Sequence, residues 1–281
     1  MNPEAPTISL VPGSYSIPPE SLFGVAERLR ASYAEADPFP HAVIDNLFPE
    51  RVLDAVLAEF PKPEALDWQR FDNPNEKKLA LKTEMQLGNA ARHLIWELNS
   101  QVFISFLEML TGIGGLVADP HLLGGGLHQI VRGGMLKIHA DFNHHQKLNL
   151  ERRTNLLIYL NRDWKEEYGG HLELWNREMT KCVKRVLPVF NRCVVFSTTD
   201  TSWHGHPVPL TCPEGWSRKS IAMYYYTNGR PADQLSPDHS TLFQARPGES
   251  VAPPPHTFKS VVKSLVPPIL TDAYRRVRGQ P

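Results

Sequence analysis

The sequence predicts an α+β fold in which helices come first and an antiparallel β-sandwich or barrel follows. Apolar residues recur at helical spacing near the N-terminus, whereas after Gly124-Gly125-Gly126 short apolar segments alternate with turn residues. Of 25 prolines, 10 lie in residues 1–63 and 9 in residues 231–281, which leaves 6 in the central 167 residues. Because proline lacks an N–H and is excluded from strand and helix interiors, the regular scaffold is expected in this central part.

Three helices are expected before the β-rich part. The first follows Pro18-Pro19, the second follows Pro49, and the third runs from about residue 90 to 110 and ends at Gly112, a residue typical of helix C-caps. A short extended piece at residues 41–44 separates the first two. The apolar residues that define the first two helices are Leu22, Val25, Ala26, Leu29, Tyr33, Leu53, Val56, Leu57 and Phe60.

Six strands are expected in the second half, with glycine pairs at 133–134 and 169–170 as turns. Many short strands without helical patterns between them indicate an antiparallel sandwich or barrel. We therefore expect an irregular leader over residues 1–19 and a single domain over 20–230. Within it, residues 20–112 give helical support and residues from about 120 to 230 form the β-core; a Pro-rich linker and C-terminal helical segment follow over 231–281. The expected strands cover residues 127–131, 135–140, 154–160, 171–175, 192–196 and 219–227.

Composition excludes several classes of function. Lys+Arg and Asp+Glu both number 30, so no polyanion-binding surface is indicated and nucleic acid is not an expected partner. The N-terminus lacks a secretory signal pattern, and no apolar stretch approaches the roughly 20 residues that span a bilayer, so no membrane partner is expected. Three cysteines cannot all pair, which favours reduced thiols and a cytoplasmic location.

The histidines suggest a metal site. His139 and Asp141 lie two apart on a predicted strand and so project from the same face. His204 follows the predicted strand at 192–196 and supplies a third ligand, and two histidines with one carboxylate form the facial triad of non-haem iron(II) oxygenases. His206 competes with His204 but precedes Pro207, where the next strand should begin, so we favour His204. A competing H-x-E at His171 has no third ligand better placed than these.

The strand predicted at 219–227 carries a possible anion site. Period two places Arg218, Ser220, Ala222 and Tyr224 on one face. An arginine fork binds a carboxylate bidentately, and a hydroxyl two residues on can add a hydrogen bond. Such a pair would suit the far end of an anionic metal chelator. On the strand at 154–160, the face that carries Asn155, Leu157 and Tyr159 is also a candidate to face inward.

These residues together resemble a known family. His139-x-Asp141, Tyr159-Leu160-Asn161, Gly169-Gly170-x-Leu172, His204 and Arg218-x-Ser220 occur in the order found in 2-oxoglutarate/Fe(II) oxygenases of the prolyl 4-hydroxylase type, and residues 38–46 resemble the start of that domain. The resemblance covers roughly residues 38–230. It implies a double-stranded β-helix, or jelly-roll, core braced by the N-terminal helices. It also implies that one oxygen atom enters the substrate while 2-oxoglutarate leaves as succinate and carbon dioxide.

The resemblance assigns roles to single residues. His139, Asp141 and His204 would be the iron ligands and catalytic centre, and Arg218, Ser220 and Tyr159 would bind the far carboxylate of 2-oxoglutarate. Gln129 falls where relatives often place a polar co-substrate contact. The implied cofactors are Fe(II), 2-oxoglutarate, O2 and ascorbate as reductant. The chain departs from the common pattern in the longer connection between His204 and Arg218, through residues 210–215.

The expected function is hydroxylation of an unactivated C–H bond in a small molecule or in a prolyl or peptide substrate. One alternative is a cupin-like metal enzyme without a keto acid, using His204, His206 and Glu214; prolines 207, 209 and 213 lie between them. Another is a non-catalytic jelly-roll binding module. Arg152 and Arg153, in the loop after the H-x-D motif, are either contacts for an acidic substrate or surface charges. The sequence leaves the oligomeric state open.

Overall fold

The protein, here as a computed structural model, is described over residues 17–252. Most of the predicted leader and the C-terminal helical segment after residue 252 lie outside the described residues, so the predicted domain limits stay predictions. Within this range four α-helices cover the N-terminal part: α1 (Pro19–Ala34), α2 (Glu50–Ala58), α3 (Asn89–Leu98) and α4 (Gln101–Thr111). Short 3-10 helices are η1 (Glu84–Gln86), η2 (Glu166–Tyr168) and η3 (Ala232–Gln234). No helix among residues 17–252 combines the length and apolar character that a bilayer crossing requires.

The predicted third helix is two helices in the structure, because the chain breaks at Asn99 and Ser100. The Ser100 hydroxyl accepts a hydrogen bond from the backbone N–H of Phe103 at 3.3 Å and so caps the start of α4. The predicted end at Gly112 is correct: this residue has φ 72° and forms the C-cap of α4.

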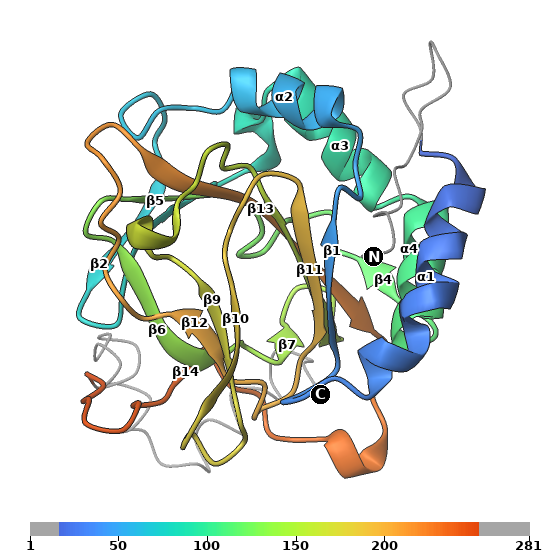
Figure 1. Cartoon of the computed structure of the whole chain (residues 1–281). Helices are drawn as coiled ribbons and strands as arrows, with labels where there is room; N and C mark the ends of the chain where they lie inside the picture. The colour runs from blue at the N-terminus through green and yellow to red at the C-terminus, as the bar shows by residue number, and fades with distance from the viewer. Residues whose placement is uncertain (1–16, 253–281) are drawn as a thin grey trace, which may run out of the picture. The chain divides into compact units, whose positions relative to one another are not determined.

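The strands form one antiparallel sheet that bends around a common interior (Figure 1). The order is β1-β11-β8-β13-β5-β3-β6-β12-β9-β10. β3 joins two parts of the sheet, because Leu79 and Ala80 pair with β5 while Glu76 and Lys77 pair with β6. This nearly closed antiparallel sheet confirms the predicted jelly-roll core. The strands are β1 (His41–Asp45), β2 (Gln69–Asn73), β3 (Glu76–Ala80), β4 (Val117–Ala118), β5 (Gly126–Val131), β6 (Met135–Ala140), β7 (His144–His145), β8 (Leu150–Tyr159), β9 (Leu172–Trp175), β10 (Cys182–Val186), β11 (Arg192–Ser197), β12 (His204–His206), β13 (Ser217–Thr227) and β14 (Leu242–Phe243).

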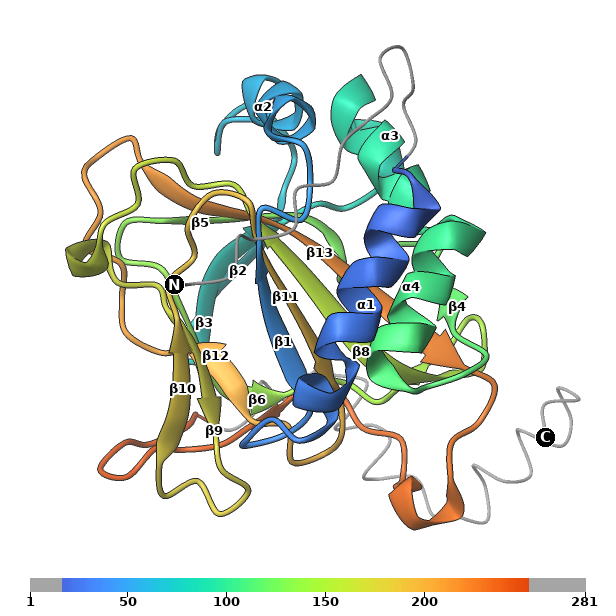
Figure 2. The ribbon, with the colours of Figure 1, turned by 45° about the vertical axis from the view of Figure 1, so that its right-hand side comes forward.

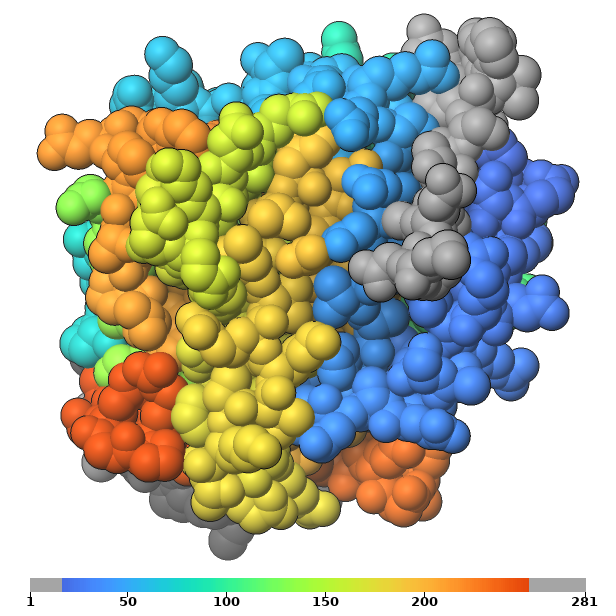
Figure 3. All heavy atoms as spheres, in the orientation of Figure 1, coloured from blue at the N-terminus to red at the C-terminus, as the bar shows by residue number. Residues whose placement is uncertain are grey.

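Some strands differ from those predicted. β3 and β10 carry charged residues in succession, such as Lys77-Lys78 and Lys184-Arg185, and β2 has no buried residue. All three therefore lack the alternation that marks a half-buried strand. The segment after residue 230, predicted as the start of a linker, contributes β14, which pairs with β6. In the space-filling view the segment that contains β14, in red-orange, lies next to the yellow β9–β10 hairpin (Figure 3).

The hydrophobic core lies between the sheet and the helices. Ile221, Met223 and Tyr225 of β13 belong to one buried apolar cluster with residues of α1 and α4, and Figure 2 shows these two helices side by side along β8 and β13. The Tyr225 hydroxyl donates to the Leu98 carbonyl at 2.8 Å. Alternate residues of β13 therefore face inward, away from the helices, and this inner face carries the polar side chains described below.

Helix α4 offers a test of this core. Leu107 is fully buried in the apolar cluster, whereas Met109 on the same helix is 37% exposed. We expect Leu107→Ala to lower the free energy of unfolding by about 2–5 kcal/mol, because it removes buried methyl groups and leaves a cavity. Met109→Ala is the control and should change it by roughly 0.5 kcal/mol or less. Urea denaturation followed by circular dichroism measures both; equal effects would contradict the assigned packing.

Candidate functional site

Three side chains meet on the inner face where β6 pairs with β12. The antiparallel register places His204 opposite His139, and Asp141 comes directly after the end of β6. The two imidazole rings have centroids 4.4 Å apart. Asp141 Oδ1 lies 3.6 Å from His139 Nε2, and Asp141 Oδ2 lies 3.3 Å from His204 Nε2. One potential ligand atom from each residue lies within 4.8 Å of the others, so the three can hold one metal ion.

The orientation of both imidazoles suits metal binding. His139 Nδ1 lies 2.8 Å from the Lys137 carbonyl and His204 Nδ1 lies 2.8 Å from the Ser202 carbonyl, so in each ring Nδ1 carries the proton. Nε2 of each ring is then directed at Asp141 and is the nitrogen that would hold a metal ion. Burial, followed by the nearby His204, lowers the pKa of His139, which favours the neutral ring. Two neutral imidazoles and a carboxylate fit a ferrous ion.

Neither of the competing motifs joins this group. A β-bulge separates His206 from His204, and His206 is not among the three residues whose ligand atoms converge. His171 Nε2 lies 2.8 Å from Glu166 Oε1, and Glu173 Oε2 accepts a hydrogen bond from the Trp175 indole. The structure therefore brings His204, as favoured from the sequence, to His139 and Asp141.

Two further side chains fix the Asp141 carboxylate. Asp141 Oδ2 accepts a hydrogen bond from Asn155 Nδ2 at 2.7 Å and lies 3.0 Å from Arg152 Nη2. Arg152 also donates to Asn155 Oδ1 through Nε at 3.0 Å and Nη2 at 2.8 Å. Burial alone would raise the pKa of Asp141, but the Arg152 guanidinium holds that pKa well below its usual value. The carboxylate is therefore ionised and held in one orientation.

Arg152 itself is enclosed. Its side chain is 1% exposed, and the guanidinium carbon lies 4.4 Å from the centroid of the Phe142 ring and 3.5 Å from that of the Tyr224 ring. Such cation–π contacts offset part of the cost of burying the charge. The sequence left Arg152 open as a surface charge or a substrate contact. Period-two alternation would place Arg152 and Asn155 on opposite faces, but a register shift in the pairing of β8 with β13 sets Arg152 opposite Tyr226, and this shift has no signal in the local sequence.

Arg218 forms a second buried cationic position on the same inner face. Its side chain is 5% exposed, Nε donates to the Gly170 carbonyl at 2.8 Å, and Nη2 donates to the Tyr159 hydroxyl at 3.2 Å. No acidic side chain among residues 17–252 forms a salt bridge with it. Burial lowers the pKa of Arg218. A buried guanidinium without a carboxylate is costly, so this position fits an anionic ligand.

Neighbouring residues complete the Arg218 position. Ser220 lies opposite Tyr159 in the pairing of β13 with β8, so both face inward as predicted. Burial raises the pKa of Tyr159, which keeps its hydroxyl protonated and able to donate. A Cβ atom at Gly170 would lie 2.7 Å from Leu210 Cδ2 and 3.0 Å from Arg218 Cδ, so glycine permits the close approach of the arginine.

Gln129 is not brought to this site. It lies opposite Lys219 in the pairing of β5 with β13, which places it on the other face of the sheet from Arg218. There its Nε2 donates to the Pro61 carbonyl at 2.9 Å, and its Oε1 accepts from the Ser217 hydroxyl at 2.9 Å. The prediction from its distance to His139 missed the alternation of faces along β5.

The long connection between His204 and Arg218 packs against the turn at residues 133–134. The backbone N–H of Gly133 donates to the Leu210 carbonyl at 2.9 Å, and that of Leu210 donates to the Gly134 carbonyl at 3.0 Å. Arg132 Nη1 donates to the carbonyls of Thr211 and Cys212. The insertion therefore lengthens the loop without moving Arg218 off the inner face.

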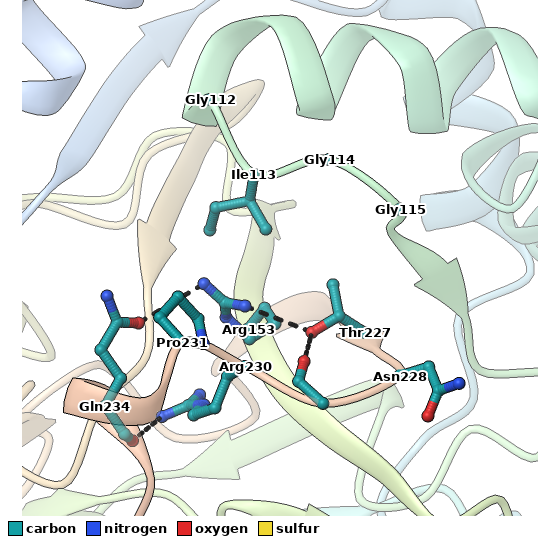
Figure 4. Close-up of a pocket in the computed structure, with 11 residues that line it drawn as sticks. Gly112, Ile113, Gly114, Gly115, Arg153, Thr227, Asn228, Arg230, Pro231 and Gln234 are labelled. Carbon is teal, nitrogen blue, oxygen red and sulfur yellow. Dashed lines mark hydrogen bonds between the residues drawn. The ribbon is translucent and has the colours of Figure 1, made fainter.

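Arg153 points to a different pocket (Figure 4). This open pocket, of about 740 Å³, is lined by residues 112–115 and by residues that follow β13, and it includes none of the triad. Arg153 Nη1 donates to the Thr227 hydroxyl at 3.3 Å, and Arg230 Nη1 donates to the Gln234 carbonyl at 3.4 Å. Both arginines lie on β8 rather than in the predicted loop, and of the two only Arg152 forms an ion pair with Asp141.

The chain is similar to known proteins in sequence and in fold. The model of the 2OG-Fe(II) oxygenase superfamily matches residues 125–226. Mouse prolyl 3-hydroxylase OGFOD1 is 25% identical over 229 residues, which cover 75% of this chain and 39% of that protein. A prolyl-4-hydroxylase from Pseudomonas putida superposes with a TM-score of 0.53 at 17% identity, covering 74% of this chain and 100% of that one. One from Phytophthora capsici gives 0.52 at 19% identity, covering 80% and 69%.

The matched region contains all three residues of the triad as well as Tyr159, Arg218 and Ser220. The predicted resemblance to 2-oxoglutarate/Fe(II) oxygenases is confirmed there, and the solved structures support the jelly-roll fold. The match supports the predicted class, a non-haem iron dioxygenase, with iron and 2-oxoglutarate as its cofactors. The chain spans 39% of the length of the curated relative.

The hydrogen bond from Asn155 to Asp141 gives a testable expectation. Asn155→Ala should weaken the binding of Mn(II), a redox-stable probe of the site, by roughly 10- to 100-fold, because partners that orient a ligating carboxylate contribute to metal affinity. Electron paramagnetic resonance of free Mn(II) measures this. Asn176→Ala is a matched control, since that side chain bonds only within the 176–181 turn. Unchanged affinity in Asn155→Ala would contradict the role given to this residue.

Proposed function

We propose that this chain is a 2-oxoglutarate- and Fe(II)-dependent dioxygenase that hydroxylates an unactivated C–H bond. The observation that carries the proposal is the convergence of His139, Asp141 and His204 on the inner face that also holds Arg218, a cation without a salt bridge in the described range 17–252. A metal-binding triad alone suits many activities. A triad beside a buried anion-binding position suits a metal enzyme whose co-substrate is a dicarboxylate.

In this proposal the triad residues hold the iron through two imidazole Nε2 atoms and the Asp141 carboxylate. When bound, the ion supplies the oxygen-activating chemistry. The chain contributes preorganisation: the carbonyls of Lys137 and Ser202 fix the two rings, and Asn155 with Arg152 fixes the carboxylate. One side of the site is thus occupied by protein, which leaves the other side for co-substrate and oxygen.

We assign the far carboxylate of 2-oxoglutarate to Arg218, Tyr159 and Ser220. The guanidinium supplies charge and N–H donors, and the protonated Tyr159 hydroxyl lies beside it. Because the position is buried, water competes poorly for these donors. In the overall reaction one atom of O2 enters the substrate C–H bond. The other atom enters succinate, which is formed from 2-oxoglutarate together with carbon dioxide.

The proposed substrate is a prolyl residue in a polypeptide. The sequence left a small molecule and a prolyl or peptide substrate open, and the name of the mouse relative, a prolyl 3-hydroxylase, favours the second.

The three cysteines, Cys182, Cys193 and Cys212, are all unpaired, which supports the proposed cytoplasmic location.

Turnover in the absence of substrate tests the activity. The protein reconstituted anaerobically with Fe(II) and 2-oxoglutarate, then given O2, should release succinate and carbon dioxide. We expect His139→Ala and Asp141→Ala to abolish this release, because each removes a ligand. His93→Ala, an exposed histidine of α3, is the control and should retain it. Metal-dependent activity that needs no 2-oxoglutarate would instead favour the cupin-like alternative.

Binding of 2-oxoglutarate tests the role of Arg218. Arg218→Ala should weaken it by about 2–5 kcal/mol, because a desolvated charge pair is lost, while Mn(II) affinity stays within about twofold. Calorimetric titration of the Mn(II)-loaded protein without oxygen gives both constants. Arg70→Ala removes an exposed arginine on β2 and serves as the control. A parallel loss of metal affinity in Arg218→Ala would point to a structural role.

A further inference from the structure

His206 is a buried polar residue that the proposed mechanism has not yet used. It is 3% exposed, and neither Nδ1 nor Nε2 has a hydrogen-bond partner among residues 17–252. Every imidazole carries at least one N–H, and burying that group without an acceptor costs free energy. By contrast, His139 and His204 each use Nδ1 for a backbone carbonyl. An unpartnered ring in a ligand-binding barrel indicates that a bound molecule completes it.

The surroundings of His206 place it near Arg218. A small cavity of about 60 Å³ is lined by both His206 and Gly170. The Gly170 carbonyl is the acceptor for Arg218 Nε at 2.8 Å, so one glycine borders the cavity and also contacts the arginine. His206 therefore lies next to the residue that accepts from Arg218, in a cavity that Glu173 and Arg185 also line.

The course of β12 explains why His206 is separate from the triad. His204 lies opposite His139, but a β-bulge shifts the register so that His206 lies opposite Leu136. Gly205, between them, approaches β6 so closely that a Cβ atom would lie 2.7 Å from the Lys137 carbonyl oxygen. The bulge thus lets two histidines two residues apart take different roles.

We propose that His206 is a further co-substrate-binding residue, which donates a ring N–H to the far carboxylate of 2-oxoglutarate beside Arg218 and Tyr159. The inference rests on the proposed function. A carboxylate accepts at about four lone-pair positions, which donors from Arg218, Tyr159, Ser220 and His206 can share. The imidazole supplies another donor, and the carboxylate supplies the missing acceptor.

The test compares two keto acids, one with and one without the arm that carries the carboxylate that His206 would contact. 2-Oxoglutarate and pyruvate share the metal-chelating end, but pyruvate lacks the far carboxylate. Their affinities for the full-length, Mn(II)-loaded protein are measured by calorimetry without oxygen. We expect His206→Leu to weaken 2-oxoglutarate binding by roughly 10- to 100-fold, as for a hydrogen bond to a charged group, and to leave pyruvate within about twofold.

Three more variants complete the design. His206→Gln keeps an N–H donor and should restore most of the affinity for 2-oxoglutarate. If the leucine variant fails to fold, His206→Phe takes its place, because it keeps a buried ring but lacks the N–H donor and should show the same selective loss. His41→Leu is the matched control, since His41 is also buried but its Nδ1 already bonds the Phe39 carbonyl at 2.9 Å. It should bind both keto acids as the unmodified protein does.

The outcomes separate this inference from the proposed function. Unchanged 2-oxoglutarate affinity in His206→Leu and His206→Gln, or equal losses for 2-oxoglutarate and pyruvate, would overturn the role of His206 and leave the dioxygenase proposal intact. Failure of the unmodified, metal-loaded protein to bind 2-oxoglutarate would overturn both.

Discussion

The site depends on the antiparallel pairing of β6 with β12, which sets His204 opposite His139. The two histidines are 65 positions apart in the chain, and this strand pairing brings them close enough to bind one metal ion. Asp141 follows directly after β6, and its carboxylate is oriented by Asn155 and Arg152, which reach it from β8. The rigid sheet thus fixes the donors, and neighbouring side chains set their orientation and charge.

Two arginines on the inner face are stabilised in different ways. Arg152 has a carboxylate partner and two aromatic rings, so its charge is compensated within the protein. Arg218 has a carbonyl and a phenol but forms no salt bridge within residues 17–252. The charge of Arg152 is therefore compensated whether or not a ligand is bound. The charge of Arg218 is compensated by an anionic ligand, and this compensation favours binding of that ligand.

Much of the site could be predicted because period-two alternation is local. It placed His139 with Asp141 on one strand face, and Arg218 with Ser220 on another. The fold class followed from the change in spacing of the apolar residues, from helical to strand-like, after residue 126. Gln129 was misplaced because its role was inferred from its distance to His139, which does not say which face of β5 the side chain occupies. Arg152 faces Asp141 because of a register shift between β8 and β13. The charged strand β3 depends on partners distant in sequence, and the break at Ser100 depends on a single capping hydroxyl.

β14 lies beyond the region that matches the oxygenase superfamily, yet it borders the metal position. It pairs with β6 at Ala140 and His139, where β3 has already ended, and the Phe243 ring lies 5.7 Å from the His139 ring. A protein shortened to residue 230 would keep every proposed ligand and still expose an open strand edge beside one of them. The sheet beside His139 is therefore completed by residues past the boundary that sequence similarity marks, through residue 243.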